Sequence, residues 1–164
     1  MTALAMAVAL LMSAEPEAAE APLPALPAGW ATPKAIKKSI CSAKERFVGR
    51  GDFDGDGKED VAMMLINDDR NRLGVFIWLA TKKAPLQVGT FDQEDGKHEM
   101  GIGVVPPGAY DTACGKGYWE CKSGEPAKLT VKKNALDVFT CERNSAYVWW
   151  NEKKKKFETV AMSD

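Results

Sequence analysis

Carboxylates are concentrated between residues 52 and 60, where the sequence reads DFDGDGKED. Counted from Asp52, aspartates occupy positions one, three, five and nine, namely Asp52, Asp54, Asp56 and Asp60. Gly57 at position six permits a sharp turn, and Lys58 at position seven offers its backbone carbonyl oxygen. Without a cation, carboxylates this close repel one another by about 1 kcal/mol per pair in water. The alternative is an Asp-rich turn that stays solvated, but five matching positions favour a metal site.

Calcium is the metal that this set of oxygen atoms favours. Magnesium prefers near-ideal octahedral geometry and keeps several waters, whereas calcium accepts many carboxylate and carbonyl oxygens. Zinc and copper prefer histidine or cysteine ligands, and the chain has one histidine, His98, and no Cys-x-x-Cys pair. Position twelve is Met63, where helix–loop–helix calcium sites place a bidentate glutamate. The strand-like sequence after the loop therefore predicts that the ion fixes the start of a β-sheet.

Residues 51–65, GDFDGDGKEDVAMML, resemble the calcium loop and first strand of FG-GAP/VCBS-type repeats. Such repeats occur in integrin α-subunit propellers and in many exported bacterial proteins. The resemblance implies side-chain ligation by the four aspartates and a carbonyl ligand from Lys58. The family usually repeats the unit to close a propeller, whereas this chain contains one DxDxDG copy.

A single copy is more similar to small periplasmic bacterial proteins that use one such loop in a propeller-like or sandwich-like β domain. Some of these are similar to invertebrate-type lysozyme inhibitors and to immunity proteins. This second resemblance implies a periplasmic or secreted module that binds another envelope protein and inhibits a hydrolase or toxin. No inhibitory motif accompanies it in the sequence.

The elements that must position the acidic loop are mostly strands. Residues 73–80, LGVFIWLA, are apolar at both alternating sets of positions, which predicts a central strand covered on both faces. Residues 101–126 are punctuated by Gly and Pro and predict a long loop. The segments that predict strands are residues 61–67, 73–80, 87–91, 127–133, 135–141, 145–151 and 156–162. The last four follow one another at even spacing, as expected for an antiparallel meander.

One helix is expected before the acidic loop. Thr32 can cap it and Pro33 suits its first position, and apolar residues then recur at helical spacing at Ala35, Ile36, Ile40 and Ala43. The expected fold is therefore mainly β, an antiparallel meander that is propeller-blade-like or sandwich-like, with one N-terminal helix.

Length and composition indicate an exported single domain. The 164 residues, 45% hydrophobic and 27% charged, suffice for one core, and a net charge of −1 favours neither nucleic acid nor an anionic membrane. Residues 1–14 are uncharged and too short to span a bilayer, which takes about 20 residues. They predict a signal peptide within residues 1–21, cleaved between 14 and 21, and the alternative is a buried N-terminal helix. A Pro-rich linker (22–30) and a calcium-stabilised β domain (31–164) follow.

Four cysteines agree with export, because an even count in a secreted chain predicts two disulfides. Four cysteines allow three pairings. The preferred pairing joins Cys114 to Cys121, closing the loop CGKGYWEC, and Cys41 to Cys141.

The sequence predicts a binding protein rather than an enzyme. His98 lies in a polar turn without a nucleophile, and the carboxylates considered for glycoside hydrolysis, Glu94, Asp95 and Glu99, share that turn. Tyr118 and Trp119, in a Gly-rich loop, are the predicted partner-binding residues, since aromatics dominate interface hot spots. Tyr147, Trp149 and Trp150 fit either a core or a binding surface, and Lys153–Lys156 predicts a solvated hairpin tip rather than a binding patch. The alternatives are a glycan-binding or polysaccharide-processing envelope protein and a purely structural envelope component.

Overall fold

The computed structural model describes residues 22–33, 47–67, 69, 71–92, 100–141 and 143–163. These residues form antiparallel strands and, within those ranges, no α-helix. The strands are β1 (Val48–Gly51), β2 (Asp60–Asn67), β3 (Arg72–Trp78), β4 (Leu86–Asp92), β5 (Met100–Val105), β6 (Gly108–Asp111), β7 (Lys128–Val131), β8 (Ala135–Thr140), β9 (Ser145–Asn151) and β10 (Lys156–Ser163). The mainly β, antiparallel fold is confirmed. The predicted helix has no support, and its residues 34–46 lie outside the described part of the chain.

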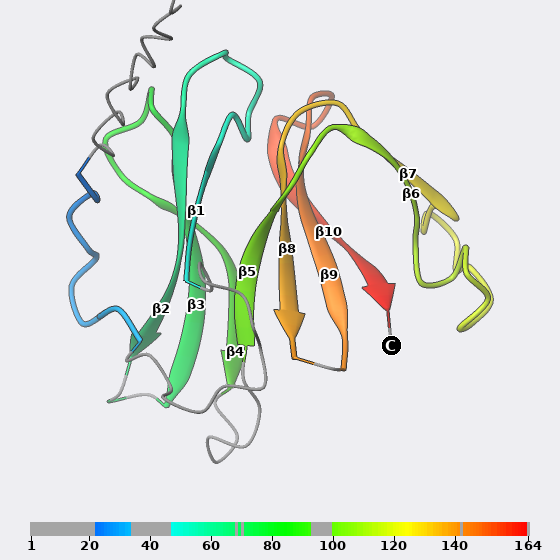
Figure 1. The fold of residues 1–164 in the computed structure, drawn as a ribbon, viewed down its shortest axis with the longest axis horizontal. Helices are drawn as coiled ribbons and strands as arrows, with labels where there is room; N and C mark the ends of the chain where they lie inside the picture. Colours follow the sequence, from blue (N-terminus) through cyan, green and yellow to red (C-terminus); the bar gives the residue numbers. More distant parts are fainter. Residues whose placement is uncertain are drawn as a thin grey trace, which may run out of the picture.

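Two four-stranded sheets make up the body of the domain (Figure 1). Sheet A has the order β1-β2-β3-β4, and sheet B has the order β10-β9-β8-β5. In sheet A, β2 and β3 form a hairpin, with Val61 opposite Trp78 and Asn67 opposite Arg72. β3 lies between β2 and β4, as its two apolar faces predicted.

The prediction of a long loop over residues 101–126 is wrong in part. Most of β5 and all of β6 fall inside it. β5 pairs with β8, which lies far along the chain, and Ile102 of β5 enters the core. The glycines at 101 and 103 concealed this strand, because glycine weakens a strand signal without preventing pairing.

The predicted four-strand meander at the C-terminus is also corrected. β8, β9 and β10 form a meander, but β7 pairs with β6 in a separate two-stranded sheet. Pro106 and Pro107 follow β5 directly and cannot donate ladder hydrogen bonds. The chain therefore leaves sheet B after β5, forms the β6–β7 hairpin, and returns to sheet B as β8.

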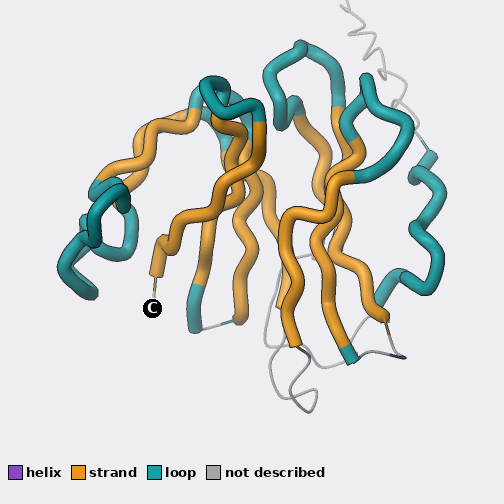
Figure 2. Tube along the Cα trace, turned by 180° about the vertical axis from the view of Figure 1, so that it is seen from behind, coloured by secondary structure: helices purple, strands orange, loops and turns teal. Residues whose placement is uncertain are grey.

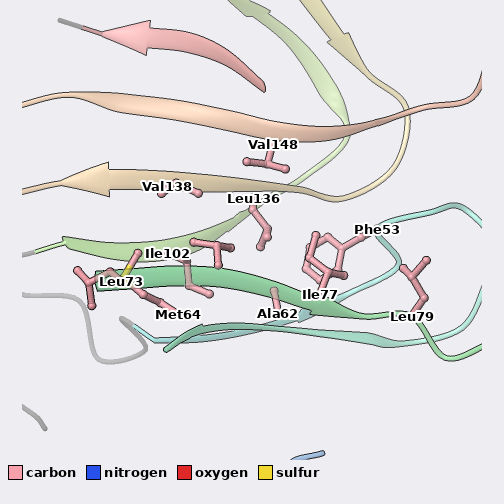
Figure 3. Packing of buried hydrophobic residues seen from close by; sticks show 11 residues of the cluster. Phe53, Ala62, Met64, Leu73, Ile77, Leu79, Ile102, Leu136, Val138 and Val148 are labelled. Carbon is pink, nitrogen blue, oxygen red and sulfur yellow. The ribbon is translucent and has the colours of Figure 1, made fainter. Parts of the chain in front are cut away.

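The main hydrophobic core lies between sheets A and B (Figure 3). Sheet A contributes Met64, Val75 and Ile77 from its inner face, and sheet B contributes Leu136 and Val148. The first strands of the two sheets, β1 and β5, also approach each other closely. A Cβ atom at Gly49 would lie 2.9 Å from Val104 Cγ2, so the absence of a side chain permits this approach.

Trp30 and Ala31 lie against sheet A, with Trp30 on its outer face. Met63, Leu65 and Phe76 form a second apolar cluster there, against which Trp30 packs. The Trp30 and Phe76 rings meet edge to face, with centroids 4.8 Å apart. Ala31, the first residue of the predicted β domain, pairs with Ile66 of β2, and Trp30, the last residue of the predicted linker, packs on the same sheet.

The outer face of sheet B is covered by residues 108–131, which we call the arm. Val131 and Leu129 of β7 cluster with Val160 and Met162 of β10, and Tyr110 meets Tyr147 edge to face with ring centroids 5.3 Å apart. Sheet A, sheet B and the β6–β7 hairpin appear in Figure 1 as three successive layers. Because other segments pack on both outer faces, two sheets bury apolar surface there without further repeats.

A disulfide and several hydrogen bonds hold the arm in place. Cys114 and Cys121 are bonded, as predicted, with Cα atoms 5.0 Å apart. The Ala113 N–H donates to the Ala161 carbonyl of β10 (2.9 Å), and Lys116 Nζ donates to the Met162 carbonyl (2.7 Å). Cys141 is also disulfide-bonded, while its predicted partner Cys41 lies outside the described residues. The arm is therefore a fixed part of the domain.

Candidate metal centre

The acidic loop connects β1 to β2 and is fastened to the core from within. Phe53, between two of the aspartates, is completely buried and belongs to the cluster between the sheets (Figure 3). The backbone of Asp52 is paired with Asn134, which precedes β8. The Asp52 N–H donates to Asn134 Oδ1 (3.2 Å), and the Asn134 N–H donates to the Asp52 carbonyl (3.1 Å). Sheet B therefore holds the start of a loop that belongs to sheet A.

Three of the predicted ligands are brought together. Carboxylate oxygens of Asp52, Asp54 and Asp60 all lie within 4.8 Å of one another. Asp60 is completely buried, and the other two are half-buried. These three carboxylates can hold a metal ion, because they converge on one point and supply the oxygen atoms that hard cations prefer.

Backbone N–H groups of the loop orient the first two carboxylates. Asp52 accepts hydrogen bonds from the Gly55 N–H (2.7 Å) and the Gly57 N–H (3.2 Å). Both glycines have positive φ, 84° and 82°, a conformation that glycine adopts without the steric cost of a Cβ atom. Asp54 accepts from the Asp56 N–H (3.1 Å). The glycines of the motif thus allow the chain to curl around the carboxylates.

Asp60 is the fixed point of the cluster. One of its oxygens accepts from the Phe53 N–H (2.9 Å) and the other from the Ala80 N–H just after β3 (2.8 Å). Burial raises the pKa of this carboxyl above its ordinary value; the two backbone hydrogen bonds lower it, and the negative charges of Asp54 and Asp56 raise it further. A buried carboxylate beside two others is costly unless a cation neutralises it, so the donor set fits a divalent metal.

The other two predicted ligands lie at the exposed end of the loop. Asp56 is outside the group of three, and its Oδ1 accepts from the Lys58 N–H (2.8 Å). Lys58 is exposed as well. The remaining acidic residue, Glu59, forms an ion pair with Arg50 (3.2 Å) and does not face the cluster. Ligation by Asp56 and by the Lys58 carbonyl stays a prediction.

Sequence reasoning missed three residues that build this centre: Phe53, Ala80 and Asn134. Phe53 carried a signal, because an aromatic residue inside an acidic turn must be buried somewhere. Ala80 and Asn134 carried none, since each acts through a hydrogen bond that only the packing of the sheets creates.

The predicted partner-binding aromatics lie on the arm. Tyr118 is 55% exposed, whereas Trp119 is half-buried and its Nε1 donates to both carboxylate oxygens of Glu125 (3.1 and 3.3 Å). Tyr147 and Trp149 pack on the outer face of sheet B, and the Trp150 ring meets Phe157, with centroids 5.0 Å apart. The residues considered for hydrolysis, Glu94, Asp95, His98 and Glu99, lie outside the described residues.

The arm disulfide is typical of a protein that folds in an oxidising, exported compartment. Across the described ranges, the structure contains no helix long and apolar enough to cross a membrane. No protein-family model matches the chain, and neither a curated protein nor a solved structure shows a significant match to it.

Proposed function

We propose that this chain is an exported, calcium-stabilised β domain that binds another protein of the cell envelope and does not itself catalyse a reaction. The observation that carries the calcium assignment is the convergence of Asp52, Asp54 and the buried Asp60. Calcium takes about six to eight oxygen ligands and tolerates the irregular geometry of a loop of this kind. The Asp56 carboxylate and the Lys58 carbonyl would complete the set by a small rearrangement of the exposed end.

Asp60 gives the calcium effect a pH dependence. Its raised folded-state pKa destabilises the metal-free fold by an amount that is absent below the unfolded-state pKa, near 3.8, and complete above the folded-state value. Calcium binds the ionised carboxylates and so removes this penalty. Protons compete with calcium for the same carboxylates. The difference in melting temperature between calcium-loaded and metal-free protein is therefore expected to shrink as the pH falls from about 7, beginning above the ordinary aspartate range.

Differential scanning fluorimetry across a pH series, on chelator-dialysed protein with and without added calcium, measures this difference. If the difference in melting temperature stayed constant as the pH was lowered to the ordinary aspartate range, the claim that a carboxyl with a raised pKa binds the proton would be contradicted.

The partner surface that we propose is a groove beside the arm. A groove of about 840 Å³ runs between the arm and the β9–β10 edge of sheet B. Its lining includes Trp119, Lys122 and Glu125 from the arm and Trp149, Phe157 and Glu158 from the sheet. Aromatic rings beside paired and unpaired charges are the usual composition of an interface centre and its rim. Tyr118 stands beside Trp119 in sequence and adds an exposed ring.

Pre-organisation supports this choice of surface. The disulfide, the Ala113–Ala161 hydrogen bond and the Lys116–Met162 hydrogen bond fix the arm before any partner binds. A rigid surface loses less conformational entropy on binding than a mobile loop does. An inhibitor or immunity protein directed at an envelope hydrolase or toxin needs such a surface, and that is the role we propose.

Affinity capture from an envelope extract tests the partner surface. The wild-type domain is expected to recover a specific protein that the Tyr118→Ala and Trp119→Ala variants lose, because truncation of a central aromatic residue typically costs about 2 kcal/mol or more. Leu23→Ala is the matched control, since Leu23 is a similarly exposed hydrophobic residue (48%) far along the chain from the arm.

Unchanged recovery by both arm variants would contradict the groove as the partner site. Retention on isolated cell-wall glycan, with no protein recovered, would instead support the glycan-binding alternative. If the domain recovered no protein and was not retained on glycan, the purely structural role would remain.

A further inference from the structure

A second cavity adjoins the groove, since Trp149 and Asn151 line both, and it lies at the end of the domain that carries the acidic loop. It has a volume of about 320 Å³ and lies between the β7–β8 turn and the β9–β10 turn. Its lining includes Trp149, Trp150, Lys133, Asn134, Asn151 and Lys153. Figures 1 and 2 show these two turns at the same end of the molecule as the β1–β2 loop. The size is at the lower end of the range for small-ligand sites.

Contacts within and between the two turns shape the walls of the cavity. Lys132 of one turn forms an exposed ion pair with Glu152 of the other (3.4 Å), a contact that adds little stability by itself. Asn151 accepts hydrogen bonds from the Lys153 N–H (3.0 Å) and the Lys154 N–H (3.1 Å), which holds the lysine-rich turn in one conformation. The site therefore exists before a ligand arrives.

The lysines near the cavity differ in whether they have a carboxylate partner. Lys154 and Lys156 contact Glu158 (2.6 and 3.9 Å), and Lys132 contacts Glu152, so carboxylates balance these cations. Lys133 and Lys153 line the cavity, and within the described residues neither takes part in an ion pair. The lining carries three lysines and one carboxylate, Glu152, and is net positive. A Cβ atom at Gly55 would lie 3.0 Å from Lys133 Cε, so the Lys133 side chain lies against the acidic loop, and Lys153 is the lysine on which the proposal below depends.

The remaining lining selects the kind of anion. The Trp149 indole offers apolar surface, while Thr130 and Asn134 offer polar groups. Trp150, the next residue of β9, points to the opposite face of the sheet, toward Phe157. Asn134 uses its Oδ1 to accept from the Asp52 N–H (3.2 Å), which leaves its side-chain N–H donors for a ligand. A sugar ring matches such a wall, because it combines an apolar C–H face with hydroxyl groups at its edge, and a carboxylate on that ring would meet the lysines.

We propose that this cavity binds a carboxylated sugar, either free or as a unit of an acidic polysaccharide. The ring lies against Trp149, Asn134 binds a ring hydroxyl, and the carboxylate is held by Lys153, with Lys133 beside it. The site adjoins the groove beside the arm, with which it shares Trp149 and Asn151, but it does not depend on the domain having a protein partner.

Paired sugars test the proposal by nuclear magnetic resonance titration of the full domain in calcium-containing buffer. N-acetylmuramic acid and N-acetylglucosamine share a ring and differ by a lactyl carboxylate, and sodium lactate supplies a similar carboxylate alone. Charge-assisted hydrogen bonds predict that the acidic sugar binds about tenfold or more tightly than either control. The Lys153→Gln variant is expected to lose that advantage while it keeps its weak binding of the neutral sugar.

Lys155→Gln is the matched control variant. The substitution removes the same charge from the same turn, but Lys155 does not line the cavity. If an acidic polysaccharide bound more tightly than its monosaccharide, the polymer would be the ligand. If the two bound equally, the free sugar would be the ligand. Equal affinity for the acidic and neutral sugars, no binding of either, or equal losses in the Lys153→Gln and Lys155→Gln variants would overturn the proposal.

Discussion

Calcium is expected to raise the melting temperature of the domain by about 5–11 °C at a concentration 100 times its dissociation constant. The corresponding gain in unfolding free energy is about 2.7 kcal/mol, because the ion binds the folded loop and not the unfolded chain. The Asp54→Asn variant is expected to lose most of this gain. Asparagine keeps the oxygen that accepts from the Asp56 N–H, so the variant removes a ligand charge while the metal-free loop retains its hydrogen bond.

Glu59→Gln is the control for this experiment. It removes the same charge from the same loop, but Glu59 pairs with Arg50 at the surface and lies outside the carboxylate cluster. The melting temperature of the Glu59→Gln variant is expected to rise with calcium by as much as that of the wild type. If Asp54→Asn retained the full rise, the charge of Asp54 would not contribute to calcium binding, and Asp54→Ala, which removes the ligand oxygen as well, would then decide whether Asp54 is a ligand. An equal loss in Asp54→Asn and Glu59→Gln would indicate a nonspecific charge effect.

The second large effect is expected at Phe53. The Phe53→Ala variant is expected to unfold with a free energy lower by about 3–5 kcal/mol, the usual cost of truncating a buried phenylalanine. Phe53 is completely buried between the sheets, and its own N–H donates to Asp60, so the side chain and the metal centre share one anchor. The variant is therefore also expected to gain less stability from calcium than the wild type.

Urea denaturation with and without calcium measures both effects. Phe53→Leu serves as the control, because leucine refills most of the cavity and should cost less and keep the calcium gain. A Phe53→Ala loss below about 1 kcal/mol would contradict the claim that this residue fastens the loop to the core.

The strands that the sequence predicted well are those with local, regular patterns. β2 and β3 form a hairpin with continuous apolar runs, and β8, β9 and β10 are short segments rich in apolar and aromatic residues that follow one another at even spacing between turn residues. This local composition and spacing predict them. β1 and β6 are short, and β5 contains two glycines, so each depends on a partner strand rather than on its own sequence.

The same distinction applies to the metal centre. The spacing of Asp52, Asp54 and Asp60 could be recognised along the chain, because the ligands belong to one loop. The supports could not be recognised so easily, since the Ala80 N–H comes from the end of β3 and Asn134 from the turn before β8. Local sequence therefore predicts the ligands, whereas the packing of the two sheets determines how they are held.

A crystal structure of the domain grown in millimolar calcium tests the central claim most directly. We predict anomalous difference density between the carboxylates of Asp52, Asp54 and Asp60, with oxygen atoms at about 2.3–2.6 Å from the ion. The Asp56 side chain and the Lys58 carbonyl should turn toward the same position. A well-ordered loop that holds only water between these carboxylates would contradict a calcium-stabilised fold.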